Sequence, residues 1–212
     1  RIAQHIAHKG LASRREAEKL ISNGRVSING KTIKDLSTKI TSYDKVYLDG
    51  DLLNFTIKPK LFLFNKPRGV MSTNKDTKGR TIIFDFLPKK IMTQKSGFLK
   101  YIGRLDYNSQ GLMLLTNDIK LKTFLERPQI QIKRKYKVKI RGLVEKKMIN
   151  KIKNGINIKG IKHRPYKIKI TSKSLSNTWL EIILTEGKNR EIRKLLSKYG
   201  FFISKLVRTE YG

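Results

Sequence analysis

The 212-residue sequence contains no cysteine and only three histidines. The missing thiols exclude disulfide bonds, thiolate zinc sites and cysteine nucleophiles. With so few imidazoles we expect no metal site, and no sequence pattern calls for a cofactor. The sequence also lacks a run of eighteen apolar residues and an amphipathic helix rich in Trp and Phe, so we expect no membrane association. No secretory signal pattern precedes the first helical pattern, and we expect a cytoplasmic protein.

Acidic residues are scarce: 16 Asp and Glu stand against 48 Lys and Arg, which gives a formal net charge of +32. Such an excess predicts a polyanionic partner, because each phosphate neutralised by a cation releases counterions. Nucleic acid fits this requirement better than a membrane surface. A bias of the whole chain towards Lys, Ile and Asn would also raise the charge without adding contacts, so the charge alone does not identify the partner.

Sequence patterns in the first fifty residues predict a small α/β unit with two helices. The apolar spacing of residues 2–7 predicts a helix that ends at Gly10. Ser13 and Glu16 form a capping-box pattern that begins a second helix. Asn29-Gly30 between two short β patterns predicts a type I′ hairpin turn, and a further strand is expected at 46–48.

Two arginines, Arg14 and Arg15, fall in the first turn of the second predicted helix. Cations there face the positive end of the helix dipole, which is mildly unfavourable, so phosphate contact explains them better than structure does. The segments GLASRREAEKLISNGRVSINGK and DKVYLDG resemble the S4-like RNA-binding domain. The resemblance implies an RNA-binding domain at 1–50, a linker at 51–58 and a second domain at 59–212.

The remainder of the chain alternates mostly strand patterns with a few helices. Expected strands lie near 61–64, 70–73, 112–115, 136–140, 166–170, 179–184 and 202–207, and expected helices near 118–127, 145–154 and 190–199. This order predicts an α+β fold with a mixed, mainly antiparallel sheet and flanking helices. Gly187-Lys188 is not a phosphate-binding loop of nucleotide hydrolases, because Asn189 stands where Ser or Thr is required.

Asp106 lies in a predicted loop directly before the buried strand expected at 112–115. A carboxylate held there loses solvation, so it needs a partner or a chemical role. Judged by spacing alone, a structural Asp paired with a neighbouring Arg is the first interpretation.

Four segments change that interpretation: FNKPRG at 64–69, GRLDYNSQGLMLLTND at 103–118, KYKV at 135–138 and TEGKNREIRKL at 185–195. In this order they resemble the pseudouridine synthases of the small-subunit and large-subunit rRNA family, over nearly the whole chain. Ser109 stands where that family usually has Thr, and Ile119 where Gly is common. The resemblance implies conversion of uridine to pseudouridine in rRNA, without a metal or a redox cofactor.

The resemblance also implies roles for three side chains. Asp106 would be the catalytic carboxylate, Arg193 the buried cation beside it, and Tyr136 the ring that stacks on the displaced uracil. From the sequence without the resemblance, Arg193 would be a solvated helix residue and Tyr136 a core aromatic.

Further residues are expected to hold the RNA. Arg104 would fill the gap left by the displaced base or bind an adjacent phosphate. Leu195 or Leu196 would line the uracil pocket, or belong to the core. The side chains expected to grip the RNA backbone, each with solvated surface as its alternative, are Lys66, Arg68, Lys188, Asn189 and Arg190, with Arg14 and Arg15 in the S4-like part.

Three function classes remain open on the sequence. The first is an enzyme that modifies large-subunit (23S) rRNA, free or in an assembly intermediate, with 16S rRNA as the variant; a monomer is expected. The second is a non-catalytic rRNA-binding or ribosome-assembly factor, which would have no reason to retain Asp106, Tyr136 and Arg193. The third, a basic ribosomal protein, leaves residues 59–212 unexplained.

Overall fold

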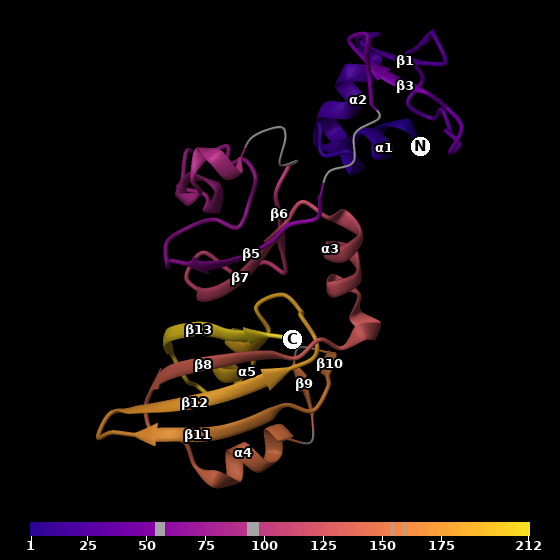
Figure 1. Ribbon diagram of the computed structural model, residues 1–212. Coiled ribbons are helices and arrows are strands. Elements are labelled where there is room, and N and C mark those ends of the chain that lie inside the picture. The colour runs from indigo at the N-terminus through magenta and orange to yellow at the C-terminus, as the bar shows by residue number, and fades with distance from the viewer. Residues whose placement is uncertain (54–57, 93–97, 154, 159) are drawn as a thin grey trace. The chain divides into compact units, whose positions relative to one another are not determined.

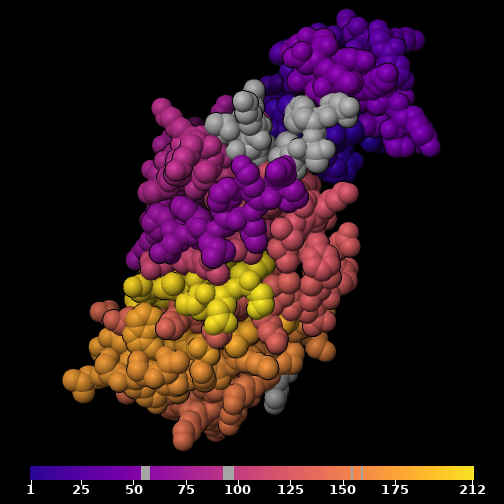
Figure 2. All heavy atoms as spheres, viewed as in Figure 1, coloured from indigo at the N-terminus to yellow at the C-terminus, as the bar shows by residue number. Residues whose placement is uncertain are grey.

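The computed structural model describes residues 1–53, 58–92, 98–153, 155–158 and 160–212 (Figures 1 and 2). The chain forms two compact units. The first unit contains Arg1–Leu61, Leu87–Lys100 and Thr116–Lys120, and the second contains Phe62–Phe86, Tyr101–Leu115 and Leu121–Gly212. None of the helices in the described part of the chain has the length and apolar character needed to cross a bilayer.

The first unit packs two helices on a four-stranded sheet of order β2-β1-β3-β4. Ile2, Ile6, Ala17, Ile21 and Val26 are buried together in its core, so the helical stripe predicted at 2–7 is confirmed. The elements are α1 (Ile2–His8), α2 (Arg14–Ser22), β1 (Val26–Ile28), β2 (Lys31–Ile33), β3 (Val46–Leu48) and β4 (Asp51–Leu52).

Two local predictions for this unit are confirmed. The Ser13 hydroxyl accepts from the Glu16 backbone N–H at 3.2 Å, and a Glu16 carboxylate oxygen accepts from the Ser13 N–H at 2.8 Å. Both donors would otherwise be unpaired at the start of α2. Asn29 and Gly30 have φ of 51° and 83°, the two positive values that a type I′ turn requires.

The range expected for a linker, 51–58, starts inside the first unit. Asp51 and Leu52 form β4, which pairs antiparallel with β3, and Leu53 is buried in the core. Residues 54–57 lie outside the described residues. The ordered chain therefore continues past residue 50 because a fourth strand completes the small sheet.

The larger sheet has the order β11-β12-β8-β13-β7-β5, with β6 also pairing with β7. The pairs β11–β12, β12–β8 and β8–β13 are antiparallel, whereas β13 runs parallel to β7. The predicted mixed, mainly antiparallel sheet is thus confirmed. Its strands are β5 (Leu61–Lys66), β6 (Lys100–Ile102), β7 (Gln110–Thr116), β8 (Arg134–Arg141), β11 (Lys167–Lys173), β12 (Asn177–Leu184) and β13 (Ile203–Tyr211).

Three helices, one hairpin and short 3-10 turns complete the fold. The inner face of α5, with Ile192, Leu195 and Leu196, is buried as predicted. The bounds are α3 (Ile119–Glu126), α4 (Lys146–Lys153), α5 (Glu191–Lys198), β9 (Ile156–Ile158), β10 (Ile161–His163), η1 (Ile83–Phe86), η2 (Lys89–Ile91) and η4 (Pro128–Ile130).

Two expected elements differ in the structure. Residues 70–73 do not form a strand; Met71 makes an isolated bridge to Ile82 instead, because its backbone pairs with the segment before η1. The last strand, β13, ends at Tyr211 rather than at 207. Polar residues with β propensity at its end concealed this extension, which pairs with the start of β8.

Candidate active site

A loop of residues 103–109, called here the Asp106 loop, joins β6 to β7. Its backbone is fixed by side chains and turns from the preceding segment. The Ser72 hydroxyl donates to the Leu105 carbonyl at 2.7 Å and accepts from the Leu105 N–H at 3.3 Å. The Gly69 N–H donates to the Tyr107 carbonyl at 2.8 Å. The loop is thus held in one shape before any substrate is bound.

The buried side chain of Lys66 binds the backbone of the Asp106 loop and does not reach the surface. Its side chain is fully buried, and its ammonium group donates to the carbonyls of Pro67, Asp106 and Ser109 at 3.0, 3.2 and 2.8 Å. Burial lowers the pKa of Lys66 to about 8, against the opposing charge of Asp106. The predicted contact of Lys66 with RNA is therefore wrong, because three converging carbonyls draw the side chain inward.

Arg208 in β13 links the start of the Asp106 loop to β7, the strand that follows the loop. Its guanidinium donates to the Leu112 carbonyl at 2.7 Å and to the Gly103 carbonyl at 3.1 Å. Gly111, with φ of 105°, packs against the backbone of Arg208, where an added Cβ would lie 2.2 Å from the carbonyl oxygen. Arg208 was not among the predicted residues, because a single Arg in a strand carries no signal of burial.

The structure brings Arg193 beside Asp106. The Arg193 Nε lies 3.4 Å from Asp106 Oδ2, an ion pair longer than an ordinary N–H···O hydrogen bond. Another guanidinium nitrogen donates to the Asn108 carbonyl at 3.0 Å and to the Ser109 hydroxyl at 3.1 Å. Burial lowers the pKa of Arg193, while Asp106 acts in the opposite direction. Arg193 thus spans the loop, and its charge faces the carboxylate.

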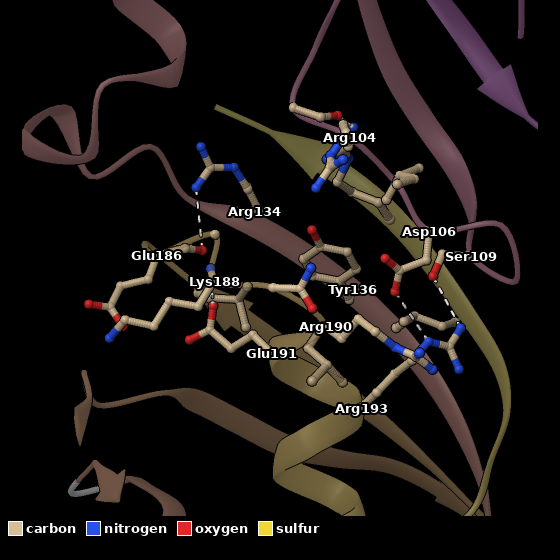
Figure 3. A pocket seen from close by; sticks show the side chains of 18 of the residues that line it. Arg104, Asp106, Ser109, Arg134, Tyr136, Glu186, Lys188, Arg190, Glu191 and Arg193 are labelled. Carbon is tan, nitrogen blue, oxygen red and sulfur yellow. Dashed lines mark hydrogen bonds and ion pairs between the residues drawn. The ribbon is translucent and has the colours of Figure 1, made fainter. Parts of the chain in front are cut away.

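Tyr136 and the Asp106–Arg193 pair line one pocket of about 470 Å³ (Figure 3). Tyr136 comes from the middle of the sheet on β8 and is 8% exposed. The side chain points to the pocket because Tyr136, Val138 and Ile140 share the inner face of the strand. A carboxylate, a cation and an aromatic ring therefore face the same concave space.

Cations surround this pocket. Among the predicted RNA contacts, Arg104, Lys188, Asn189 and Arg190 line it. Arg68 is exposed and does not line it, although its charge contributes to lowering the pKa of Arg193. Arg14 and Arg15 are exposed on α2 in the first unit, where Arg14 pairs with Glu18.

Two further arginines of the pocket, Arg134 and Arg164, were missed. The Arg134 guanidinium donates to the Glu186 carbonyl and the Tyr211 hydroxyl, and Arg164 pairs with the Glu186 carboxylate at 3.4 Å. In a chain so rich in cations, the sequence offers no signal that separates these arginines from solvated ones.

The apolar side of the pocket differs from the one expected. Leu195 and Leu196 are fully buried and do not line it, so the predicted uracil contact is wrong and the core alternative holds. These side chains occupy the face of α5 that packs on the sheet. The apolar lining comes instead from Leu105, Leu184, Ile192 and Leu206.

A buried polar cluster supports the start of α5. One Glu191 carboxylate oxygen lies 3.0 Å from both His163 Nδ1 and the Tyr166 hydroxyl, and the other accepts from the Lys188 N–H at 3.0 Å. Burial, with the Glu191 charge, raises the pKa of the Tyr166 hydroxyl. These contacts hold the 188–190 segment, in which Arg190 has φ of 51°, at the edge of the pocket.

The same cluster contains the described residues best spaced for a metal ion. Ligand atoms of His163, Glu186 and Glu191 lie within 4.8 Å of one another. Their oxygens already accept from protein donors, however: the Lys188 ammonium lies 2.8 Å from Glu186, and Tyr166 donates to Glu191. A metal ion would have to displace these donors, so the cluster fits a structural role better.

Comparisons with known proteins identify the two domains of the chain. The family model of RNA pseudouridylate synthase matches residues 60–198, and the S4 domain model matches residues 1–46. An uncharacterized RNA pseudouridine synthase of Rickettsia prowazekii is 40% identical over 215 residues, which cover 100% of this chain and 87% of that protein.

Two further matches also extend over the whole chain. Ribosomal large subunit pseudouridine synthase B of Bacillus subtilis is 38% identical over 217 residues, which cover 100% of this chain and 85% of that protein. A crystal structure of a pseudouridylate synthase matches with a TM-score of 0.69 and 26% identity, over 100% of this chain and 88% of that one. The chain therefore belongs to the RNA pseudouridylate synthase family and carries an S4 domain.

Proposed function

We propose that this protein converts a specific uridine of 23S rRNA to pseudouridine, with Asp106 as the catalytic carboxylate. The observation that carries the proposal is the Asp106–Arg193 pair, which faces a pocket shared with Tyr136. The Asp106 side chain is 40% exposed and so is open to a substrate, and the partly buried Arg193 beside it supplies a fixed opposite charge that orients the carboxylate.

The reaction rearranges bonds within one nucleotide. The N1–C1′ glycosidic bond breaks, the uracil turns, and a C5–C1′ bond forms; the C5 proton is lost and N1 gains a proton. Asp106 acts as the nucleophile on the ribose–uracil unit, and no electrons are exchanged with another molecule. Tyr136 stacks on the detached uracil and keeps it in the pocket while it turns.

Access to C1′ requires the uridine to leave the base stack, at a cost of about a few kcal/mol. Arg104, which is exposed at the pocket, fills the gap in the RNA. Lys188, Asn189 and Arg190 bind phosphates next to the target nucleotide, and Arg68 extends this surface. The S4 domain, with Arg14 and Arg15 exposed on α2, binds a further part of the RNA.

The proposal that 23S rRNA is the substrate rests on the names of two relatives. The Bacillus subtilis and Pasteurella multocida relatives, 38% and 34% identical, are both named ribosomal large subunit pseudouridine synthase B. We therefore place the reaction in the cytoplasm on large-subunit rRNA, free or in an assembly intermediate, with the enzyme as a monomer. The same reaction on 16S rRNA, or rRNA binding without catalysis, is the alternative that the experiment must separate.

Tritium release tests the proposal, because loss of the C5 hydrogen accompanies isomerisation. The purified chain is incubated with 23S and 16S transcripts that contain [5-³H]uridine. We expect release from 23S RNA alone with the native chain and none with Asp106→Asn. Asp85→Asn, an exposed residue outside the pocket, should retain full activity.

Each other outcome decides between the alternatives. Tritium release from the 16S transcript alone would show that 16S rRNA, and not 23S rRNA, is the substrate. Tight binding of 23S RNA without release from either transcript indicates a non-catalytic factor. Release that persists in Asp106→Asn removes the catalytic role of Asp106.

A further inference from the structure

The larger sheet has a second charged surface on the side away from the pocket. Side chains alternate along a strand, so Lys137 and Lys139 of β8 point opposite to Tyr136 and Val138. Strand register adds neighbours on the same side: Lys205 of β13 lies opposite Lys139. We call Lys137, Lys139, Lys167, Lys169 and Lys205 the lysine face; β11, β12, β8 and β13 adjoin in that order (Figure 1).

Lys167 and Lys169 lie on the edge strand β11, where lysines also prevent pairing with another chain. Folding does not explain Lys137, Lys139 and Lys205, which lie on the inner strands β8 and β13. Lysine is depleted in strands, and like charges directly opposite each other destabilise a sheet. Lys139 and Lys205 form such a cross-strand pair. Polar neutral residues would cover the same backbone without repulsion, so the lysines indicate a function for this surface.

Few carboxylates balance the lysine face. Glu181 lies 3.1 Å from Lys169, and Glu210 pairs with Lys135 at the end of the strand. Glu181 is also directly opposite Lys137 on the neighbouring strand, but within the described part of the chain no carboxylate oxygen lies within 4.0 Å of the ammonium groups of Lys137, Lys139 and Lys205. An extended anion would therefore find unneutralised ammonium groups on adjacent strands.

An aromatic side chain lies among these lysines. Trp179 of β12 is directly opposite Lys139 and points to the same side of the sheet, with its side chain partly exposed. Cations interleaved with an aromatic ring on an open surface are typical of proteins that bind nucleic acid strands. Trp179 is also the single tryptophan of the sequence, so its fluorescence reports on this surface.

We infer that the lysine face is a second RNA-binding surface, which holds the sugar-phosphate backbone of the substrate RNA outside the target nucleotide. The inference rests on the proposed function for the identity of the polyanion as RNA. Because the pocket and the lysine face use opposite sides of β8 and β13, an RNA that contacts both must pass an edge of the sheet. A short hairpin that fills the pocket would not reach the second surface.

The first test measures Trp179 emission in the full chain. A large-subunit rRNA fragment should change the emission and reduce its quenching by acrylamide, whereas a short hairpin with the target uridine should do neither. Emission and quenching that stay constant with the long fragment at saturation would overturn the inference.

The second test removes charge without touching the pocket. In the combined variant Lys137→Gln, Lys139→Gln, Lys205→Gln, affinity for the long fragment should fall several-fold. The slope of log affinity against log salt should become shallower by about two to three, since each phosphate contact contributes about 0.7–0.9. The melting temperature should stay the same or rise, because a like-charge pair is removed.

A matched control separates contact from net charge. Lys146→Gln, Lys147→Gln, Lys151→Gln changes three exposed lysines of α4 by the same total charge. We expect affinity, salt slope and the Trp179 signal to stay close to the native values. Equal losses in both variants would overturn the inference, as would selective capture of an acidic protein with no effect on RNA.

Activity distinguishes this inference from the proposed function. On the short hairpin, the lysine-face variant should convert uridine at the native rate. If the native chain converts no RNA at all, the proposed enzyme function fails, whereas the fluorescence and salt measurements still decide whether the lysine face binds RNA.

Discussion

Asp106 has a cation on each side of its loop. Arg193 faces the carboxylate, and Lys66 binds the backbone oxygen of the same residue. The two cations differ in surroundings, because Lys66 is fully buried and the Arg193 side chain is 18% exposed. The Asp106 side chain itself is 40% exposed, so the two fixed cations orient the carboxylate before the RNA arrives, and their effect should strengthen when the RNA excludes water from it.

Arg193→Lys tests this orientation. A lysine keeps the charge but loses the planar group that reaches Asp106, Asn108 and Ser109 together. Charge-assisted hydrogen bonds contribute about 1.5–3 kcal/mol, so kcat should fall by about 10- to 100-fold with KM nearly unchanged. Steady-state kinetics measure both constants. Lys194→Gln, exposed on the same helix, is the control, and a change confined to KM would contradict the assigned role.

Lys66 should make stability depend on pH in the alkaline range. Burial lowers its pKa from 10.5 to about 8, so between these values the unfolded chain binds more protons than the folded chain. The contribution of this group to the free energy of unfolding therefore rises as pH increases from 8 to 10.5. Urea unfolding should show that the stability difference between the native chain and Lys66→Met grows over this window. A constant difference would contradict the assignment.

The sequence predicted some of these side-chain environments and not others. Motif resemblance predicted that Arg193 and Asp106 act together, although they lie far apart in the chain. Lys66 was assigned to the wrong environment, and the choice between pocket and core stayed open for Leu195 and Leu196, because burial depends on where distant carbonyls and apolar faces converge. No local pattern contains that information.

At the scale of elements, the close contact of β13 with β7 positions the Asp106 loop. The two strands are parallel neighbours, and Gly111 lies opposite Arg208. Arg208 in turn binds the carbonyls of Gly103, where the loop begins, and of Leu112, in β7 after the loop. Periodicity predicted most strands and the buried face of α5. It missed this contact, because a parallel pairing depends on residues separated by most of the second unit.

Gly111→Ala should therefore disrupt the fold more than glycine conformation alone requires. A Cβ would meet the Arg208 carbonyl oxygen at 2.2 Å, so the strands must separate. We expect a loss of more than about 3 kcal/mol in the free energy of unfolding. Gly79→Ala, at φ of 67° with nothing within 4 Å, should cost about 1–2 kcal/mol. Similar losses in denaturant unfolding would show that contact with Arg208 is unimportant.

In the whole molecule, the formal charge of +32 is spread along the entire chain, including the S4 domain, the pocket and both sides of the larger sheet. Composition correctly predicted the chemical class of the partner, a polyanion, but it did not indicate which cations would bind it. Since lysine occurs throughout the chain, only the structure separates cations with assigned positions, such as Arg134, from solvated ones. The motifs, not the charge, carried the prediction of the family.

Arg14 and Arg15 test the contribution of the S4 domain. In the double variant Arg14→Gln, Arg15→Gln, we expect weaker binding of the rRNA fragment. The slope of log affinity against log salt should become shallower by about one to two, and kcat should be unchanged at saturating RNA. Lys31→Gln, Lys34→Gln removes the same charge from exposed positions in and after β2 and should have little effect. Filter binding across a salt series compares them, and an equal slope change in both variants would contradict a contact at α2.

If Asp106 catalyses pseudouridine formation in 23S rRNA, the pseudouridine content of that RNA in cells must depend on this side chain. Chemical mapping would compare rRNA from cells with the native chain, without it, and with Asp106→Asn at equal abundance. We predict that one 23S position loses pseudouridine both without the chain and with Asp106→Asn, while Asp85→Asn restores it. A 23S map identical in all cells, or full modification by Asp106→Asn, would contradict the account.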